Sequence, residues 1–218
     1  MNDMRSIRTR VKVCGLTRAV DARAAVLAGA DAIGVILVPG ARRFVTHVEA
    51  AAVLNTAPPF VTRVGVFVDA SLGDILEAVD ELALDVVQLS GDEGPDLCAQ
   101  LPVPVVKAFH VGPGFSARDV ALFGDVIAAA LLDSAVPGEH GGTGVTFDWN
   151  VVREACVGVP VIVAGGLTPA NVGDSIAAAR PFAVDVSSGV EATLREKDPT
   201  KLAAFMTAVR AADAAVDR

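Results

Sequence analysis

The stretch PVIVAGGLTPANVGDSIAAARPFAVDVSSG, residues 160–189, contains two short aliphatic runs with an Ala-rich segment between them. The runs begin at Pro160 and Ala183, and they lack the apolar–polar alternation of a half-buried strand. Such runs are typical of strands buried on both faces of a parallel sheet. Thr168 followed by Pro169 predicts the start of a helix between them, because proline suits the first helical position. The stretch therefore predicts one strand–helix–strand unit of an α/β fold.

The same unit recurs along the chain, without a low-complexity linker or a shift in composition. We therefore predict a single α/β domain over residues 1–218, with residues 1–10 as a short polar N-terminal extension. Eight units could also form a doubly wound open sheet. Charged and Gly-rich residues repeatedly follow the runs, however, and in a closed (β/α)8 TIM barrel these positions converge on one rim. The closed, parallel, eight-stranded barrel is the expected fold. The runs begin at Val11, Ala32, Thr62, Val86, Val103, Val126, Pro160 and Ala183.

Helix boundary signals lie between the runs. Thr17 is a candidate N-cap for the first helix, with Gly29 as its C-terminal stop. Ser71, followed three residues later by Asp74, resembles a capping box. Either Thr146 or Asp148 could open the helix after the sixth run.

Composition and charge exclude several functions. The formal net charge of −8 argues against nucleic acid or an anionic membrane surface as the main partner. No apolar run reaches the roughly 18 residues of a membrane span, and residues 1–10 do not resemble a signal peptide. Cys14, Cys98 and Cys156 are odd in number and widely spaced, which favours reduced thiols in the cytoplasm. None of the three histidines lies near another, so a histidine-centred metal site is not expected.

Small residues end the seventh and eighth runs. Gly165 and Gly166 would let backbone amides approach a ligand closely, and Ser188 and Gly189 would open a short extra helix. A phosphate between the seventh and eighth loops is a recurrent feature of barrels, which predicts a phosphate site here. The alternative is that the glycines only form tight left-handed turns. That alternative explains one Gly-Gly pair well, but it explains the two clusters together less well.

Reactive side chains occupy other run ends. Cys14 ends the first run and Asp133 the sixth, while Arg43 lies in the loop after the second. Each has a plain structural alternative: a buried inert thiol, a loop cap and a surface salt bridge, respectively. Lys12 and Lys107 lie within runs, which leaves a Schiff-base lysine as a minor alternative.

Several motifs together resemble one known family. VKVCGLT, GADAIGVI, VQLSGDE, LLDSAVPGEHGGTGVTFDW, VIVAGGLTPANV and VDVSSGVEATLREKD occur in this order from about Val11 to the last helix. Their sequence and spacing resemble phosphoribosylanthranilate isomerase of tryptophan biosynthesis. The resemblance implies an Amadori rearrangement of N-(5-phosphoribosyl)anthranilate that needs no cofactor. It also implies a small phosphorylated substrate as the partner, and it is compatible with a monomer or a homodimer.

The resemblance assigns roles to individual residues. It implies that Cys14 is the general base, that Asp133 is the general acid and that Arg43 holds the anthranilate carboxylate. Asp185 is a weaker candidate for orienting the substrate amine. These roles require a raised pKa at the carboxyl group of Asp133, from burial, and a lowered pKa at the thiol of Cys14, from nearby amide dipoles. Backbone groups of Gly165, Gly166, Ser188 and Gly189 would hold the phosphate, and Gly142 to Gly144 would shape the neighbouring loop.

Two departures from the family pattern concern the aromatic end of the substrate. Ser90 stands where the family usually has histidine, and Gly40-Ala41-Arg42-Arg43 replaces an S-x-R loop. A shifted substrate range is therefore one alternative, and a non-catalytic phosphosugar-binding barrel is another. Indole-glycerol-phosphate synthase and ribulose-phosphate epimerase are further rivals, but their lysine–glutamate and metal-binding histidine sets are not complete in this sequence.

Overall fold

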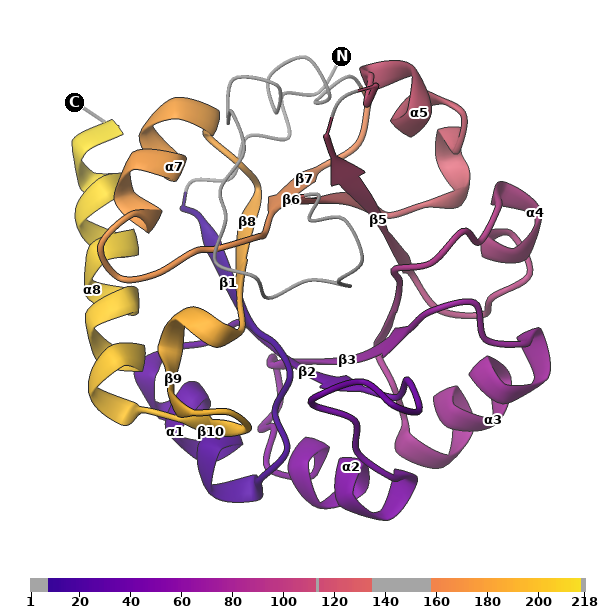
Figure 1. Ribbon diagram of the computed structural model, residues 1–218, viewed down its shortest axis with the longest axis horizontal. Coiled ribbons are helices and arrows are strands. Elements are labelled where there is room, and N and C mark those ends of the chain that lie inside the picture. The colour runs from indigo at the N-terminus through magenta and orange to yellow at the C-terminus, as the bar shows by residue number, and fades with distance from the viewer. Residues whose placement is uncertain (1–7, 113, 135–157, 217–218) are drawn as a thin grey trace.

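Eight parallel strands close into a barrel, with each strand hydrogen-bonded to the next and β8 to β1. The computed structural model describes residues 8–112, 114–134 and 158–216. Helices surround the barrel in Figure 1, and chain colour advances around the ring from β1 to α8. The predicted closed barrel is confirmed, and the open-sheet alternative is wrong. The strands are β1 Arg10–Val13, β2 Ala32–Ile36, β3 Thr62–Phe67, β4 Val86–Leu89, β5 Val105–Val111, β6 Ala129–Ser134, β7 Val161–Val163 and β8 Ala183–Val186.

Helices cover the outside of the described barrel, and α8 packs against both α7 and α1. No helix in the described ranges is long and apolar enough to cross a membrane. The helices are α1 Ala19–Ala28, α2 His47–Leu54, α3 Leu72–Leu82, α4 Pro95–Cys98, α5 Ala117–Ala121, α7 Val172–Ala179 and α8 Pro199–Val216, with 3-10 turns η1 Gly124–Val126 and η2 Ser188–Val190. A hairpin of β9 Glu191–Thr193 and β10 Glu196–Lys197 follows η2.

Side chains alternate along the strands between the barrel interior and the layer beneath the helices. On β1, Val11 and Val13 belong to the large apolar cluster under the helices, whereas Lys12 faces the interior. The register pairs Lys12 with Asp185 on β8. The interior therefore carries ionisable groups among its small aliphatic side chains. The separate apolar cluster that lines it contains Ala108, Ala129, Leu131, Ile162, Ala164 and Ala183.

Two of the predicted helix boundaries are confirmed. Ser71 caps α3, and its side chain accepts a hydrogen bond from the backbone N–H of Asp74. Gly29 ends α1 with a φ of 109°, a left-handed conformation that favours glycine. Gly29 therefore acts as the stop that the sequence predicted.

Two other predicted helix starts are wrong. The N-cap of α1 is Arg18 rather than Thr17, whose hydroxyl donates to the carbonyl of Arg195 in the β9–β10 turn at 2.8 Å. Similarly, α7 begins at Val172 rather than directly after Thr168. The Asn171 carboxamide oxygen accepts from the N–H of Thr168 at 2.7 Å and closes a separate turn. At Thr17 a contact outside the helix takes the capping hydroxyl, whereas the hydroxyl of Thr168 accepts from the N–H of Ala170 at 3.3 Å in the turn before α7.

Candidate active site

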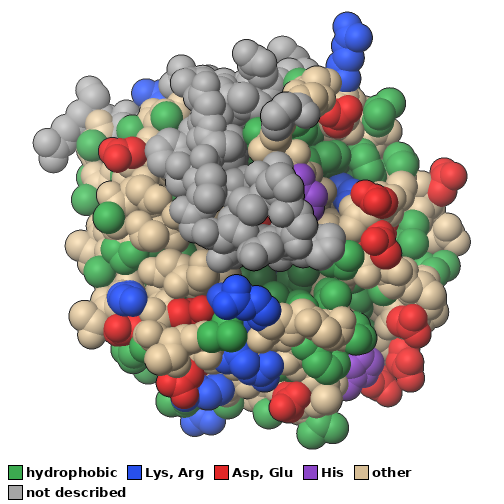
Figure 2. Space-filling view, viewed as in Figure 1, with side chains coloured by type: hydrophobic (Ala, Val, Ile, Leu, Met, Phe, Trp, Pro, Cys, Tyr) green, Lys and Arg blue, Asp and Glu red, His purple; other side chains and the backbone are tan. Residues whose placement is uncertain are grey.

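A pocket of about 630 Å³ opens at the carboxyl ends of the barrel strands. Cys14, Asp133 and Asp185 all line it, on β6, on β8 and directly after β1. Arg42 and Arg43 line it from the loop after β2. Figure 2 shows Lys and Arg side chains gathered beside the hollow on this face. A chain with a net charge of −8 thus carries basic groups at the place where an anionic ligand would enter.

Cys14 ends the first strand with its side chain on the pocket wall. Its backbone N–H donates to the carbonyl of Val186 on β8 at 2.9 Å, which fixes the residue at the seam between β1 and β8. Burial raises the pKa of the Cys14 thiol above its ordinary value, although the ammonium groups of Lys12 and Lys197 act against this. The expected lowering of the thiol pKa is therefore wrong for this structure, because desolvation outweighs the nearby positive charges.

Asp133 lies on β6, where the strand register pairs it with His110 on β5. Both residues line the pocket. The strands β7 and β8 separate β6 from β1, so the carboxyl group of Asp133 and the thiol of Cys14 reach the pocket from different sides. The prediction that both groups lie at the same rim is borne out by this geometry.

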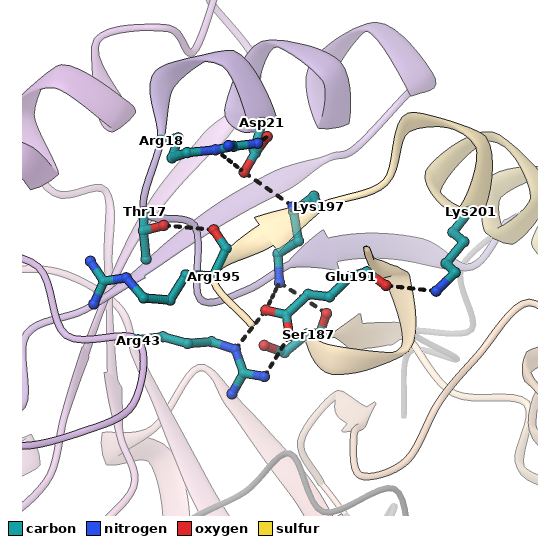
Figure 3. Close-up of polar contacts among 9 residues, drawn as sticks. All are labelled: Thr17, Arg18, Asp21, Arg43, Ser187, Glu191, Arg195, Lys197 and Lys201. Carbon is teal, nitrogen blue, oxygen red and sulfur yellow. Dashed lines mark hydrogen bonds and ion pairs between the residues drawn. The ribbon is translucent and has the colours of Figure 1, made fainter. Parts of the chain in front are cut away.

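Arg43 is buried and forms a double hydrogen bond with Glu191, the first residue of β9. Its Nε and Nη2 atoms donate to the two carboxylate oxygens at 2.7 Å each (Figure 3). Burial opposes the charge of Glu191, but the hydrogen bonds from Arg43 and the charge of Lys197 hold the pKa of its carboxyl below the usual range. The surface salt bridge considered for Arg43 is wrong, because both partners are buried.

Lys197 joins this pair from β10. Its Nζ atom lies 3.2 Å from Oε1 of Glu191 and donates to the carbonyl of Ser187 at 2.9 Å (Figure 3). Burial lowers the pKa of the Lys197 ammonium. Two cations therefore share one carboxylate beneath the pocket, which leaves a net positive charge beside Cys14.

Lys12 and Asp185 form a second buried pair. The Nζ atom of Lys12 donates to Oδ2 of Asp185 at 2.8 Å. The other carboxylate oxygen, Oδ1, is buried without a hydrogen-bond partner in the described ranges. Because Asp185 lines the pocket, this oxygen is an available acceptor for a donor on a ligand.

The loops after β7 and β8 touch each other at the rim. Gly165 and Gly166 line the pocket with φ angles of 82° and 62°, so both adopt the left-handed turn conformation. Ser188 also lines the pocket and begins η2, the short helix predicted there. Gly189 is set behind that wall, and a Cβ atom built on it would lie 1.8 Å from the carbonyl oxygen of Leu167. Gly142 and Gly144, assigned to the neighbouring loop, lie outside the described residues.

Ser90 lines the pocket after β4 and accepts a hydrogen bond from Nε2 of Gln88 at 3.1 Å. Nearby, the Nζ atom of Lys107 lies 2.9 Å from Oε2 of Glu93, and both side chains are buried. The ion pairs of Lys107 and Lys12 do not fit the Schiff-base alternative, because a nucleophilic lysine must be uncharged. No group of three His, Cys, Asp or Glu side chains in the described ranges could hold a metal ion.

Sequence reasoning missed two site residues, Glu191 and Lys197, and it did not predict the ion pair of Lys12. Glu191 and Lys197 belong to the stretch VEATLREKD, which contributes to the family resemblance but had no role assigned within it. The partner of Glu191 is far away in sequence, since Arg43 precedes it by 148 residues. The only available signal was the presence of charged residues directly after the eighth strand.

Ionisable groups thus meet at the carboxyl ends of strands that close into a barrel. This arrangement is characteristic of the (β/α)8-barrel enzymes, which build their active sites at this rim. Comparison with known proteins gives the particular family. Residues 11–208 match the family model described as N-(5'phosphoribosyl)anthranilate (PRA) isomerase. The chain belongs to this family of isomerases.

Named relatives and solved structures agree with this assignment. N-(5'-phosphoribosyl)anthranilate isomerase of Pseudomonas savastanoi pv. phaseolicola is 48% identical over 200 residues, or 92% of this chain and 97% of the relative. The crystal structure of phosphoribosyl anthranilate isomerase from Thermotoga maritima is 37% identical, with a TM-score of 0.83 over 93% of this chain and 99% of that one. A crystal structure of such an isomerase in complex with reduced 1-(o-carboxyphenylamino)-1-deoxyribulose 5-phosphate is 36% identical, with a TM-score of 0.80 and the same coverage.

Proposed function

We propose that this chain converts N-(5'-phosphoribosyl)anthranilate to 1-(2-carboxyphenylamino)-1-deoxyribulose 5-phosphate, a step of tryptophan biosynthesis. In this proposal Cys14 is the general base and Asp133 the general acid. The observation that carries it is the presence of both side chains on the wall of one pocket in a member of this isomerase family. The compound bound in the related crystal structure has a carboxylate at one end and a phosphate at the other.

Asp133 and Cys14 each carry out one proton transfer in the proposed reaction, and a tautomerisation completes it. Asp133 in its protonated form donates to the ring oxygen of the ribose, the C1′–O bond breaks and the anthranilate nitrogen forms a Schiff base at C1′. Cys14 as the thiolate then removes the proton from C2′, and the electron pair moves through C1′ toward the nitrogen. The resulting enolamine takes up a proton at C1′ and loses the proton of its C2′ hydroxyl group, which gives the ketone. The iminium itself withdraws electrons from C2′, so the chemistry requires no cofactor.

Arg43 binds the anthranilate carboxylate in this proposal. A guanidinium has five N–H donors, and Glu191 occupies two of them along the Nε–Nη2 edge. The edge formed by Nη1 and Nη2 remains able to contact a second carboxylate in a bidentate manner. Glu191 thus fixes the plane of the guanidinium without using up its binding capacity, and Arg42 adds positive charge at the pocket wall.

The rest of the substrate fits the remaining groups on the pocket wall. The buried Oδ1 of Asp185, an acceptor without a donor in the described ranges, suits the N–H of the substrate amine. Backbone groups of Gly165, Gly166 and Ser188 would contact the phosphate, because the two touching loops expose main chain at the rim. Gly189 supports this phosphate site by allowing the loops to approach.

A turnover assay tests the proposal directly. Purified protein is mixed with freshly made N-(5'-phosphoribosyl)anthranilate, and the fluorescence of the anthranilate group is followed. We expect fluorescence to fall with time in proportion to the enzyme concentration. Saturable binding of the substrate without any fall in fluorescence would support the non-catalytic barrel instead. Absence of both binding and turnover would contradict the proposed substrate.

A further inference from the structure

Lys12 and Cys14 lie two residues apart, in β1 and directly after it. Alternate residues of a strand share a face, so both side chains point into the barrel, with Lys12 one layer below Cys14. Only about 7% of the Lys12 side chain is exposed, and it reaches upward to Asp185 at 2.8 Å. The ammonium group is therefore held inside the barrel, beneath the thiol.

Gly34 on β2 makes room for this arrangement. A Cβ atom built on Gly34 would lie 3.2 Å from Sγ of Cys14 and 3.4 Å from Nζ of Lys12. The sulfur and the ammonium nitrogen thus flank the same small space, the one that any larger side chain at residue 34 would occupy. Because residue 34 has no side chain, the ammonium group of Lys12 and the thiol of Cys14 can both border this space. The positive charge therefore lies close to the thiol.

Four charged groups act on this thiol from the elements around it. Lys12 on β1 and Lys197 on β10 favour its thiolate form, whereas Asp185 on β8 opposes it. The negative charge of a Cys14 thiolate stabilises the positive charge of Arg43, in the loop after β2, so Arg43 also favours the thiolate. Burial is the strongest influence and favours the neutral thiol. The positive charges therefore offset part of the effect of burial, and Lys12 contributes the largest of these offsets.

We propose that Lys12 is a positioning residue whose ammonium group, oriented by Asp185 and admitted by the space at Gly34, is the counter-ion of the Cys14 thiolate. This inference rests on the proposed function, in which Cys14 acts as the base. Lys12 keeps its protons throughout the reaction. The proton from C2′ of the substrate passes to Sγ of Cys14, the thiolate becomes a thiol, and Lys12 remains paired with Asp185. The ion pair thus supports the basic form without itself transferring a proton.

Direct titration of the Cys14 thiol tests this inference. The rate of alkylation of Cys14 by iodoacetamide is measured against pH, with modification read from the mass of the peptide that contains it. This readout requires neither substrate nor turnover, and it separates Cys14 from the other two cysteines. We expect Lys12→Met to raise the pKa of the thiol by about 1–3 units, the usual effect of one opposite charge at close range.

Asp185→Asn provides the matched variant, with an expected effect of opposite sign. It removes the anion but retains the ammonium, whose nearest remaining counter-ion is the thiolate, so the thiol pKa should fall. A purely structural ion pair would not shift the thiol in opposite directions in the two variants. If Lys12→Met does not fold because it leaves a buried unpaired carboxylate, Lys12→Met/Asp185→Asn removes both charges together. The double variant should still titrate above the wild type, since Lys12 acts on the thiol more strongly than Asp185 does.

The two proposals fail in different ways. An unchanged thiol pKa in Lys12→Met and in the double variant, or shifts of the same sign in both single variants, would overturn the role of Lys12. Cys14 could still be the base in that case. Normal turnover by Cys14→Ala would overturn the proposed function, while leaving the effect of Lys12 on the thiol intact.

Discussion

The guanidinium of Arg43 donates through Nε and Nη2 to the two carboxylate oxygens of Glu191, at 2.7 Å each. The pair joins the loop after β2 to the start of β9, and both side chains are less than a tenth exposed. Lys197 supplies a second cation to the same carboxylate. Arg43 thus reaches the pocket in an orientation that is set before any ligand arrives. Preorganisation of this kind lowers the entropic cost of binding.

Replacing Arg43 by alanine should weaken substrate binding more than it slows the chemistry. Hydrogen bonds to charged groups contribute about 1.5–3 kcal/mol, which corresponds to a rise in KM of about 10- to 150-fold. Steady-state kinetics provide the measurement, and Arg23→Ala is the matched control because Arg23 is exposed on α1 and does not line the pocket. An unchanged KM in Arg43→Ala would contradict the proposed carboxylate contact.

Replacing Glu191 by glutamine should affect both stability and binding. Removal of one partner from a buried ion pair typically costs about 3–5 kcal/mol, because the other charge stays buried without compensation. Here two cations, Arg43 and Lys197, would lose their shared anion. We expect a lower midpoint in chemical denaturation and a raised KM from a less fixed Arg43. Wild-type stability together with wild-type KM would show that the pair has no positioning role.

Acid should remove the contribution of Glu191. Its pKa in the folded state lies below the value of about 4.3 in an unfolded chain, so the unfolded state binds more protons near that pH. The stabilisation is complete above about pH 4.3 and is lost as the pH falls through the lower, folded-state pKa. Denaturation measured from pH 7 downward should therefore show wild type and Glu191→Gln converging in acid. A stability difference that stays constant across this range would refute the linkage.

The strands and the rim could be predicted from sequence because their signals are local. Each aliphatic run marks a buried strand, and Cys14 and Asp133 directly follow or end such runs, so the topology of a barrel brings them together. The ion pairs could not be predicted in this way. Lys12 and Asp185 are 173 residues apart, and only the closure of β1 against β8 makes them neighbours.

The failed predictions have the same origin in tertiary structure. Thr17 has the residue type of an N-cap, but the carbonyl of Arg195 takes its hydroxyl hydrogen bond. The pKa of Cys14 depends on how completely the folded barrel removes water from the sulfur, and no local pattern records that quantity. Sequence therefore indicated which groups reach the pocket, whereas their charges and partners required the structure.

Loss of either proton-transfer group should reduce turnover without loss of the fold. General acid–base groups typically contribute about 10²- to 10⁴-fold, so Cys14→Ala and Asp133→Asn should each lower kcat by at least about 10²-fold. Circular dichroism should remain that of the wild type. Cys98→Ala is the matched control, because this second buried cysteine lies in α4 and does not line the pocket. Wild-type turnover by either site variant would refute the role assigned to that residue.

Gly189 tests the phosphate site through its supporting geometry. In Gly189→Ala the new Cβ would lie 1.8 Å from the carbonyl oxygen of Leu167, so the loops after β7 and β8 must move apart. We expect weaker binding of inorganic phosphate and of substrate, together with a lower thermal midpoint. Gly173→Ala is the matched control: it lies in α7, its new Cβ would meet its nearest neighbour at 4.0 Å, and alanine there should stabilise the helix by about 0.5–1 kcal/mol. Wild-type phosphate affinity in Gly189→Ala, measured by calorimetry, would show that the contact between the two loops does not shape the phosphate site.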